Sequence, residues 1–146
     1  MKLTDHWFTA LSESEQGQLV FVTGRKDLQQ FRATGSLKIR AEIAWPYQAD
    51  AEGMPNEHDA ALIAEIEPKL RRIMEHDKLA ILTGNYTGGG VKYWVFYTRH
   101  LPTFGQRLNE CLAEYETLPL EILCEEDPEW GEYTDMLSME HTDDED

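Results

Sequence analysis

Segment 79–99 constrains the fold of this chain more than any other. Apolar, β-branched and aromatic residues flank the polar, glycine-rich segment Asn85–Gly90, and such residues suit strands that pack on one face. Gly88, Gly89 and Gly90 can adopt positive φ without a Cβ clash, so the chain can reverse there. The segment therefore predicts a β-hairpin.

A helical pattern precedes this hairpin and another follows it. Asn56 is a good N-cap, and apolar residues then recur at helical spacing, which predicts a helix from about Asn56 to about Glu75. Pro68 lies in this range and should bend or split the helix. Pro102 should open the second helix. That helix carries one apolar stripe, made of Phe104, Leu108, Cys111, Leu112 and Tyr115.

Each helix has a further strand on its far side. Apolar and polar side chains alternate along residues 37–47, which predicts a strand with one face on a core. A second alternation predicts a strand after Pro119. Its core face should consist of Leu120, Ile122 and Cys124, and its acidic outer face of Glu121, Leu123 and Glu125. We therefore expect both cysteines, Cys111 and Cys124, to be buried thiols.

The two ends of the chain add further elements. Residues 6–11 and 18–23 predict an N-terminal hairpin, and residues 25–35 predict a loop with a single turn of helix at most. Near the C-terminus, Trp130, Tyr133 and Leu137 can line one face of a short closing helix. We expect one α+β domain over residues 1–137, followed by an acidic disordered tail over residues 138–146.

The order of elements from Leu37 to Glu125 is β-α-β-β-α-β, which is the order of the ferredoxin-like superfold. Right-handed crossovers would place both helices on one face of an antiparallel sheet. We therefore predict a ferredoxin-like two-layer sandwich with an added N-terminal β-hairpin and a short C-terminal helix. The N-terminal hairpin either extends the sheet or covers its other face.

The formal charge of −15 is unevenly distributed. Eleven of the 28 acidic residues lie from Glu125 onward, where there is no Lys or Arg; the other 17 stand against 13 basic residues, which leaves −4. Such a field repels phosphate backbones, so we expect no nucleic-acid partner. Outward-facing aromatic residues on such a sheet could stack RNA bases. If Tyr93 and Tyr97 face outward, we expect the N-terminal hairpin to cover them instead. A basic protein is the partner that the charge favours.

Metal, cofactor and membrane sites find little support in the sequence. The five histidines are scattered, without the spacing of a metal site, so we expect no metal and no cofactor. No apolar run approaches the roughly 20 residues of a membrane span, and residues 1–6 contain no apolar leader pattern. We therefore expect no membrane partner and a cytoplasmic location.

Arg99 is the charged residue that we single out as a candidate site. It ends the aromatic strand, and it can pair with Glu125 and Asp127 to tie the sheet to the segment that contains Trp130. The alternative is an anion-recognising arginine in a pocket with Trp45, Tyr47 and Asn85. Both arrangements remain open at this point.

Several phrases of the sequence occur together in a known family. They are Trp45–Tyr47, Asp50–Pro55, Leu82–Asn85, Trp94–Arg99 and Glu125–Trp130. Over roughly Trp7 to Tyr133 the chain resembles the bacterial domain of unknown function family 695. That family is associated with domains similar to the ribonuclease E inhibitor family, which also has a ferredoxin-like fold. The resemblance implies a regulatory binding module and assigns no role to single residues.

Two functional hypotheses follow. The first is a non-catalytic protein-binding or regulatory module with an acidic surface, whose partner-binding residues include Glu125, Asp127 and Trp130. The second is a small-molecule-binding domain or enzyme that uses the region of Trp45, Tyr47, Asn85 and Arg99. By analogy with other ferredoxin-like folds, a homodimer is a further alternative.

Overall fold

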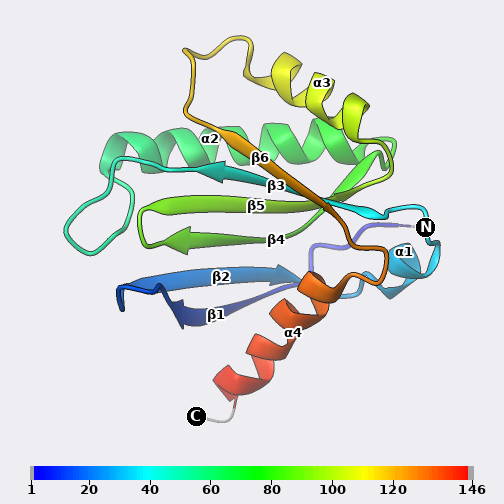
Figure 1. The fold of residues 1–146 in the computed structure, drawn as a ribbon, viewed down its shortest axis with the longest axis horizontal. Helices are drawn as coiled ribbons and strands as arrows, with labels where there is room; N and C mark the ends of the chain where they lie inside the picture. The colour runs from blue at the N-terminus through cyan, green and yellow to red at the C-terminus, as the bar shows by residue number, and fades with distance from the viewer. Residues whose placement is uncertain (1, 145–146) are drawn as a thin grey trace.

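The computed structural model describes residues 2–144, and its centre is a six-stranded antiparallel sheet in the order β1-β2-β4-β5-β3-β6 (Figure 1). The strands are β1 (Trp7–Glu13), β2 (Leu19–Arg25), β3 (Ile39–Trp45), β4 (Ala80–Gly88), β5 (Val91–Thr98) and β6 (Glu121–Glu126). The helices are α1 (Gln29–Ala33), α2 (Glu57–Glu75), α3 (Leu101–Leu112) and α4 (Gly131–Asp144). The fold is therefore of the α+β class, as the sequence predicts.

The predicted central hairpin is confirmed as β4 and β5. Gly88 lies opposite Val91, and the two residues of the turn, Gly89 and Gly90, have φ values of 61° and 88°. These values lie in the left-handed region, which glycine adopts without steric cost. The glycine-rich tip is thus a tight hairpin turn.

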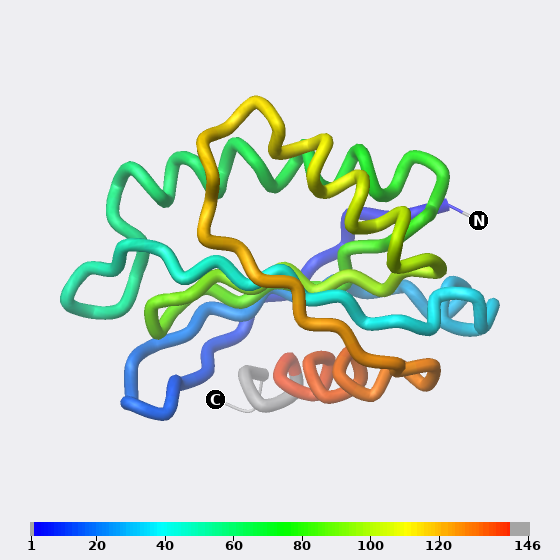
Figure 2. Tube along the Cα trace, turned by 45° about the horizontal axis from the view of Figure 1, so that its top comes forward, coloured from blue at the N-terminus to red at the C-terminus, as the bar shows by residue number. Residues whose placement is uncertain are grey.

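Helices α2 and α3 cover one face of the sheet (Figure 2). Asn56 caps α2 as predicted, because its side chain accepts the Asp59 N–H at 2.8 Å. Pro68 lies inside α2, and the helix continues through it as one element of 19 residues. The core of this layer contains Trp45 from β3, Ile66 from α2 and Phe104 from α3.

The opposite face is covered by α4 and α1. The buried side chains there include Phe31, Tyr97, Trp130, Tyr133 and Met136. The N-terminal hairpin extends the sheet next to β4, which resolves the alternative that the sequence leaves open. The expectation that this hairpin covers Tyr97 is wrong, because the Trp130 ring stacks on Tyr97 at 4.4 Å between centroids.

A pair of glycines makes room for α4. Gly24 and Gly84 lie opposite each other on β2 and β4. A Cβ atom at Gly84 would overlap the sulfur of Met136, and one at Gly24 would overlap the ring of Phe8. The missing side chains therefore form the slot in which Met136 is buried.

The N-terminal hairpin is fastened to α2 by a buried ion pair. The side chain of Arg25 is 2% exposed, and its Nη1 donates to Glu75 Oε2 at 2.9 Å and to the Leu82 carbonyl at 3.1 Å. Its Nε donates to the Thr4 carbonyl at 2.9 Å, and its guanidinium lies 5.0 Å from the centre of the Trp7 ring. One side chain thus joins β2, α2, β4 and the N-terminal segment.

The predicted boundary between domain and tail differs from the end of α4. That helix continues to Asp144 and so includes residues 138–144, which the sequence analysis assigns to the acidic tail. Glu145 and Asp146 lie outside the described residues. Within residues 2–144, no helix is both long enough and apolar enough to cross a membrane.

Candidate functional site

Strand β6 forms one edge of the sheet, and all six of its residues are exposed. In the described part of the chain it pairs with β3 alone. The Asp127 N–H donates to the Lys38 carbonyl at 2.7 Å, one step beyond the strand. Bonded and non-bonded pairs alternate in an antiparallel ladder. The backbone N–H and C=O groups of Ile122, Cys124 and Glu126 therefore point away from β3 and are free to pair with another strand.

The prediction that Cys124 faces a core is wrong. Its side chain is exposed, and Ile122 and Leu123 are 40% and 47% exposed. The alternation correctly indicates a strand with two faces. However, α3 packs against α2 and does not cover β6 (Figure 2). The strand therefore exposes both apolar and acidic side chains to solvent.

Arg40 of β3 binds acidic residues on β6, just after β6 and on β3 itself. Its guanidinium lies 2.6 Å from Glu125, 3.4 Å from Asp127 and 3.3 Å from Glu42. The sequence predicts this role for Arg99, whereas in the structure Arg40 performs it. The signal was available, because Arg40 lies on the polar face of a clear strand, and cross-strand neighbours on one face interact.

Asp127 anchors the start of α4. One carboxylate oxygen accepts the Gly131 N–H at 2.9 Å, and the other accepts the Tyr97 hydroxyl at 2.6 Å and the Glu132 N–H at 3.3 Å. Partial burial works against the charge, but the Tyr97 and backbone hydrogen bonds prevail and hold the pKa of Asp127 below its usual range. The hydrogen bonds of the Asp127 carboxylate therefore stabilise the fold.

Trp130 is a core residue. It is 1% exposed, and its indole N–H donates to the Leu37 carbonyl at 2.8 Å. Its ring also meets the Tyr133 ring edge-on at 5.4 Å. Glu125, Asp127 and Trp130 therefore lie in one region, as the first hypothesis requires, but only Glu125 offers an exposed side chain.

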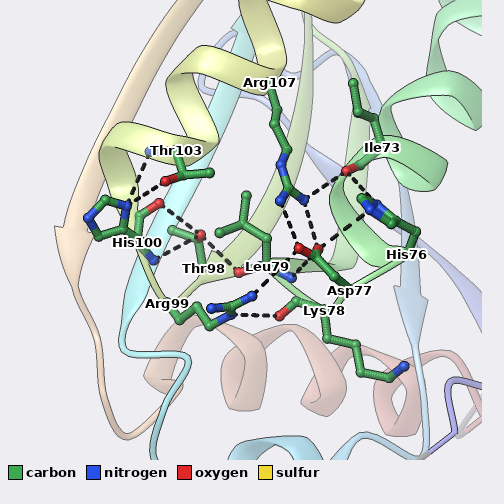
Figure 3. A network of polar contacts seen from close by, with 10 residues as sticks. All are labelled: Ile73, His76, Asp77, Lys78, Leu79, Thr98, Arg99, His100, Thr103 and Arg107. Carbon is green, nitrogen blue, oxygen red and sulfur yellow. Dashed lines mark hydrogen bonds and ion pairs between the residues drawn. The ribbon is translucent and has the colours of Figure 1, made fainter.

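Arg99 lies in a different network, at the far end of β5 (Figure 3). Its guanidinium is 3.7 Å from Asp77 and donates to the Lys78 carbonyl at 3.4 Å. Asp77 is bound mainly by Arg107, with two contacts at 2.8 and 2.7 Å, and these hydrogen bonds hold its pKa far below the usual range. The predicted pair of Arg99 with Glu125 and Asp127 is wrong.

Trp45, Tyr47 and Asn85 are brought together near the start of β5, but Arg99 is not. Trp45 lies opposite Lys92, so Arg99 is seven residues further along, or about 20 Å away. All three of the former residues are buried, and the Tyr47 hydroxyl donates to the Gly53 carbonyl at 2.6 Å. They form a structural cluster.

The buried cation beside this cluster is Lys92, which is not among the predicted site residues. Its Nζ donates to Asn85 Oδ1 at 2.8 Å and to Thr87 Oγ1 at 2.9 Å, and it lies 3.7 Å from Glu67. Burial lowers the pKa of Lys92. No sequence signal marked it, because Lys92 lies beside the turn of a hairpin, where lysine is usually solvated.

Comparison of the sequence with models of known protein families gives a match. The model of a family described as a family of unknown function, DUF695, matches residues 5–138. The chain belongs to the DUF695 family. No curated protein and no solved structure matches it.

The DUF695 chain has two neighbouring cavities beside α3. One, of about 510 Å³, lies between the start of α2 and the segment 114–119, and Trp45 and Tyr115 contribute to its wall. The other, of about 400 Å³, is a groove between α3 and β6. Both are lined by residues 115–118. Tyr47, Asn85 and Arg99 line neither of them.

Across the described side chains of this DUF695 domain, no three His, Cys, Asp or Glu residues are grouped as metal ligands would be. Cys111 is half-buried, and burial raises the pKa of its thiol, which disfavours the reactive thiolate.

We expect Glu132→Gln to stabilise this DUF695 domain at neutral pH. Burial raises the pKa of Glu132, although the Tyr86 hydroxyl donates to its Oε1 at 2.6 Å; Oε2 has no partner. A carboxyl group with a raised pKa in the fold binds protons more tightly there than in the unfolded chain. Its ionised form therefore costs stability above the folded-state pKa, and this cost disappears below the unfolded value of about 4.3.

Urea unfolding at pH 7 and at pH 3.5 measures this effect. The advantage of Glu132→Gln over the natural chain should be present at pH 7 and lost at pH 3.5. Glu129→Gln, on an exposed neighbour, is the matched control and should change little at either pH. An equal effect of Glu132→Gln at both pH values would contradict the assignment.

Proposed function

We propose that this chain is a non-catalytic protein-binding module that accepts an extended segment of a partner along β6. The observation that carries the proposal is the row of outward-facing backbone groups at Ile122, Cys124 and Glu126. Addition of a strand to an exposed sheet edge is a recurring mode of peptide recognition, in which backbone hydrogen bonds provide affinity.

The charge of the edge favours a basic partner. Glu121 and Glu126 are exposed and make no ion pair or side-chain hydrogen bond with any described residue. Glu125 is also exposed, although Arg40 binds it. Acidic groups at an interface attract a basic partner and accelerate association, and this attraction weakens as salt is added.

The topology supports a ferredoxin-like unit as the scaffold of this site. Within the sheet, the strands from β3 to β6 have the spatial order β6-β3-β5-β4, and α2 and α3 lie on one face. In this interpretation β1, β2, α1 and α4 are additions to a β-α-β-β-α-β core. The resemblance to the ribonuclease E inhibitor family favours a regulatory role.

We also propose a bacterial, cytoplasmic setting. Both cysteines are free thiols in the structure, which suits a reducing compartment. The acidic charge disfavours nucleic acid as a partner.

The second candidate function is small-molecule binding, and the cavity beside Trp45 favours it. Its volume of about 510 Å³ is sufficient for a small ligand. Trp45 is the one residue of the predicted set that lines it. Leu62→Trp would fill this cavity, and retention of β6-dependent protein capture by that variant would separate the two candidates.

Proline at position 124 is expected to abolish partner capture. Proline has no N–H, and it is tolerated on edge strands where the N–H faces solvent. Cys124→Pro should therefore remove one outward donor and leave the ladder to β3 intact. Cys124→Ser retains the N–H and is the matched control.

The measurement is affinity capture from a bacterial lysate, quantified by mass spectrometry, at about 0.05 M and about 0.5 M salt. We expect a set of proteins that the natural chain and Cys124→Ser retain at low salt and that Cys124→Pro loses. If Cys124→Pro and Cys124→Ser retain the same proteins, the partner does not bind by strand addition at β6.

A further inference from the structure

A groove lies beside the start of β6, on the side of the strand that faces α3. It has a volume of about 400 Å³, and its apolar lining includes Leu108, Leu112, Leu118, Leu120 and Ile122. Leu108 is buried, whereas Ile122 is 40% exposed. The groove therefore offers a buried apolar floor and an open rim at the strand edge.

The groove lies on the side to which a bound strand would direct half of its side chains. In an antiparallel or parallel pair, residues directly opposite each other present their side chains to the same face. Ile122 lines the groove, so Cys124 and Glu126, two and four residues on, share its face. Glu121, Leu123 and Glu125 lie on the other face, where Glu125 contacts Arg40.

On this basis, which rests on the proposed function, we infer that the segment added to β6 alternates bulky apolar with basic residues. The apolar side chains enter the groove against Leu108, Leu112 and Ile122. The basic side chains lie on the opposite face beside Glu121 and Glu125. Backbone bonds provide affinity at any such edge, while pockets for alternate side chains provide specificity.

The charge of β6 argues against a second copy of this chain as the occupant. An antiparallel pair of two β6 strands centred on Leu123 would place Glu121 of one copy opposite Glu125 of the other, and a pair centred on Cys124 would place Glu121 opposite Asp127. Like charges directly opposite each other destabilise a strand pair. A chain with a formal charge of −15 also repels its own copies. A basic segment of a different protein meets neither obstacle.

Two neighbouring residues provide a matched test. Ile122 and Leu123 are both exposed apolar residues on β6, and they lie on opposite faces of the strand. Only Ile122 lines the groove. Ile122→Ser should therefore weaken binding of the apolar side chains, whereas Leu123→Ser should leave it nearly unchanged.

The probe is a fluorescein-labelled ten-residue peptide that alternates lysine and valine, titrated against the full chain by fluorescence anisotropy. We expect saturable binding, weakened about tenfold by Ile122→Ser and at most about twofold by Leu123→Ser. A peptide that alternates lysine and serine has the same charge and should bind at least about tenfold more weakly than the first. Circular dichroism verifies that each variant is folded.

Each other outcome identifies what has failed. The inference about the groove is wrong if the lysine–valine peptide does not bind up to about 1 mM, or if Ile122→Ser and Leu123→Ser have equal effects. The capture experiment on β6 is then judged separately. Equal binding of the two peptides overturns the apolar requirement. If Cys124→Pro binds the peptide as Cys124→Ser does, strand addition itself fails. A dimer in sedimentation that Ile122→Ser dissociates would identify a second copy as the occupant and overturn the choice of partner.

Discussion

Replacing Glu75 with glutamine should lower the free energy of unfolding by about 3 kcal/mol. The substitution conserves the shape of the side chain and removes its charge. The Arg25 side chain, 2% exposed, would then be a buried cation without its closest carboxylate. Glu75 Oε2 also accepts the Leu82 N–H at 2.8 Å, so the change reaches β4 as well as β2.

Urea unfolding followed by circular dichroism measures the loss. Glu65→Gln is the control, since Glu65 lies on the same helix with its side chain 56% exposed, and surface changes of this kind cost less than about 0.5 kcal/mol. The double variant Arg25→Met with Glu75→Leu should recover part of the loss, because it removes both buried charges. A cost for Glu75→Gln no larger than that for Glu65→Gln would show that the pair contributes little to stability.

Trp130→Ala should destabilise the chain by about 3 to 5 kcal/mol. The substitution leaves a cavity where the indole stacks on Tyr97, and it removes the hydrogen bond to the Leu37 carbonyl. Trp130 precedes α4 directly, so its loss should also release that helix from the sheet. Limited proteolysis should then cleave the chain near residue 130 before it cleaves the rest.

Trp130→Phe separates the two contributions. It retains most of the stacked ring and loses the N–H donor, so its cost should be well below that of alanine. The exposed neighbour Glu129 provides a control, since Glu129→Ala should change neither stability nor cleavage. Equal costs for phenylalanine and alanine would mean that the hydrogen bond, and not the packing, fixes α4.

Local pattern was enough to predict most of the elements. The alternation in residues 37–47, the cap at Asn56 and the glycines at 88–90 each act within a few residues of their own position. Interactions of this kind are encoded in the local sequence, so β3, α2 and the β4–β5 turn are found where they were predicted. Helix α1 has only five residues and was too short to show a period.

Contacts between distant segments were predicted less well. Alternation in β6 indicates two faces, but whether a helix covers either face depends on where α3 packs, and that is set by α2. Hence Cys124 was assigned to a core that does not reach it. The partner of an arginine also depends on strand register, which pairs Arg40 with Glu125 and places Arg99 beside Leu79 and Asp77 instead. Trp130 was recognised as part of a closing segment, yet its complete burial requires the sheet face that Tyr97 provides.

The slot formed by Gly24 and Gly84 has a consequence for sequence variation among homologues. Three positions on three different elements share one small volume, so they cannot vary independently. A homologue with alanine or a larger residue at position 84 should have a shorter side chain than methionine at position 136. Covariation of these two positions across the DUF695 family would then report the docking of the last helix without any further structure.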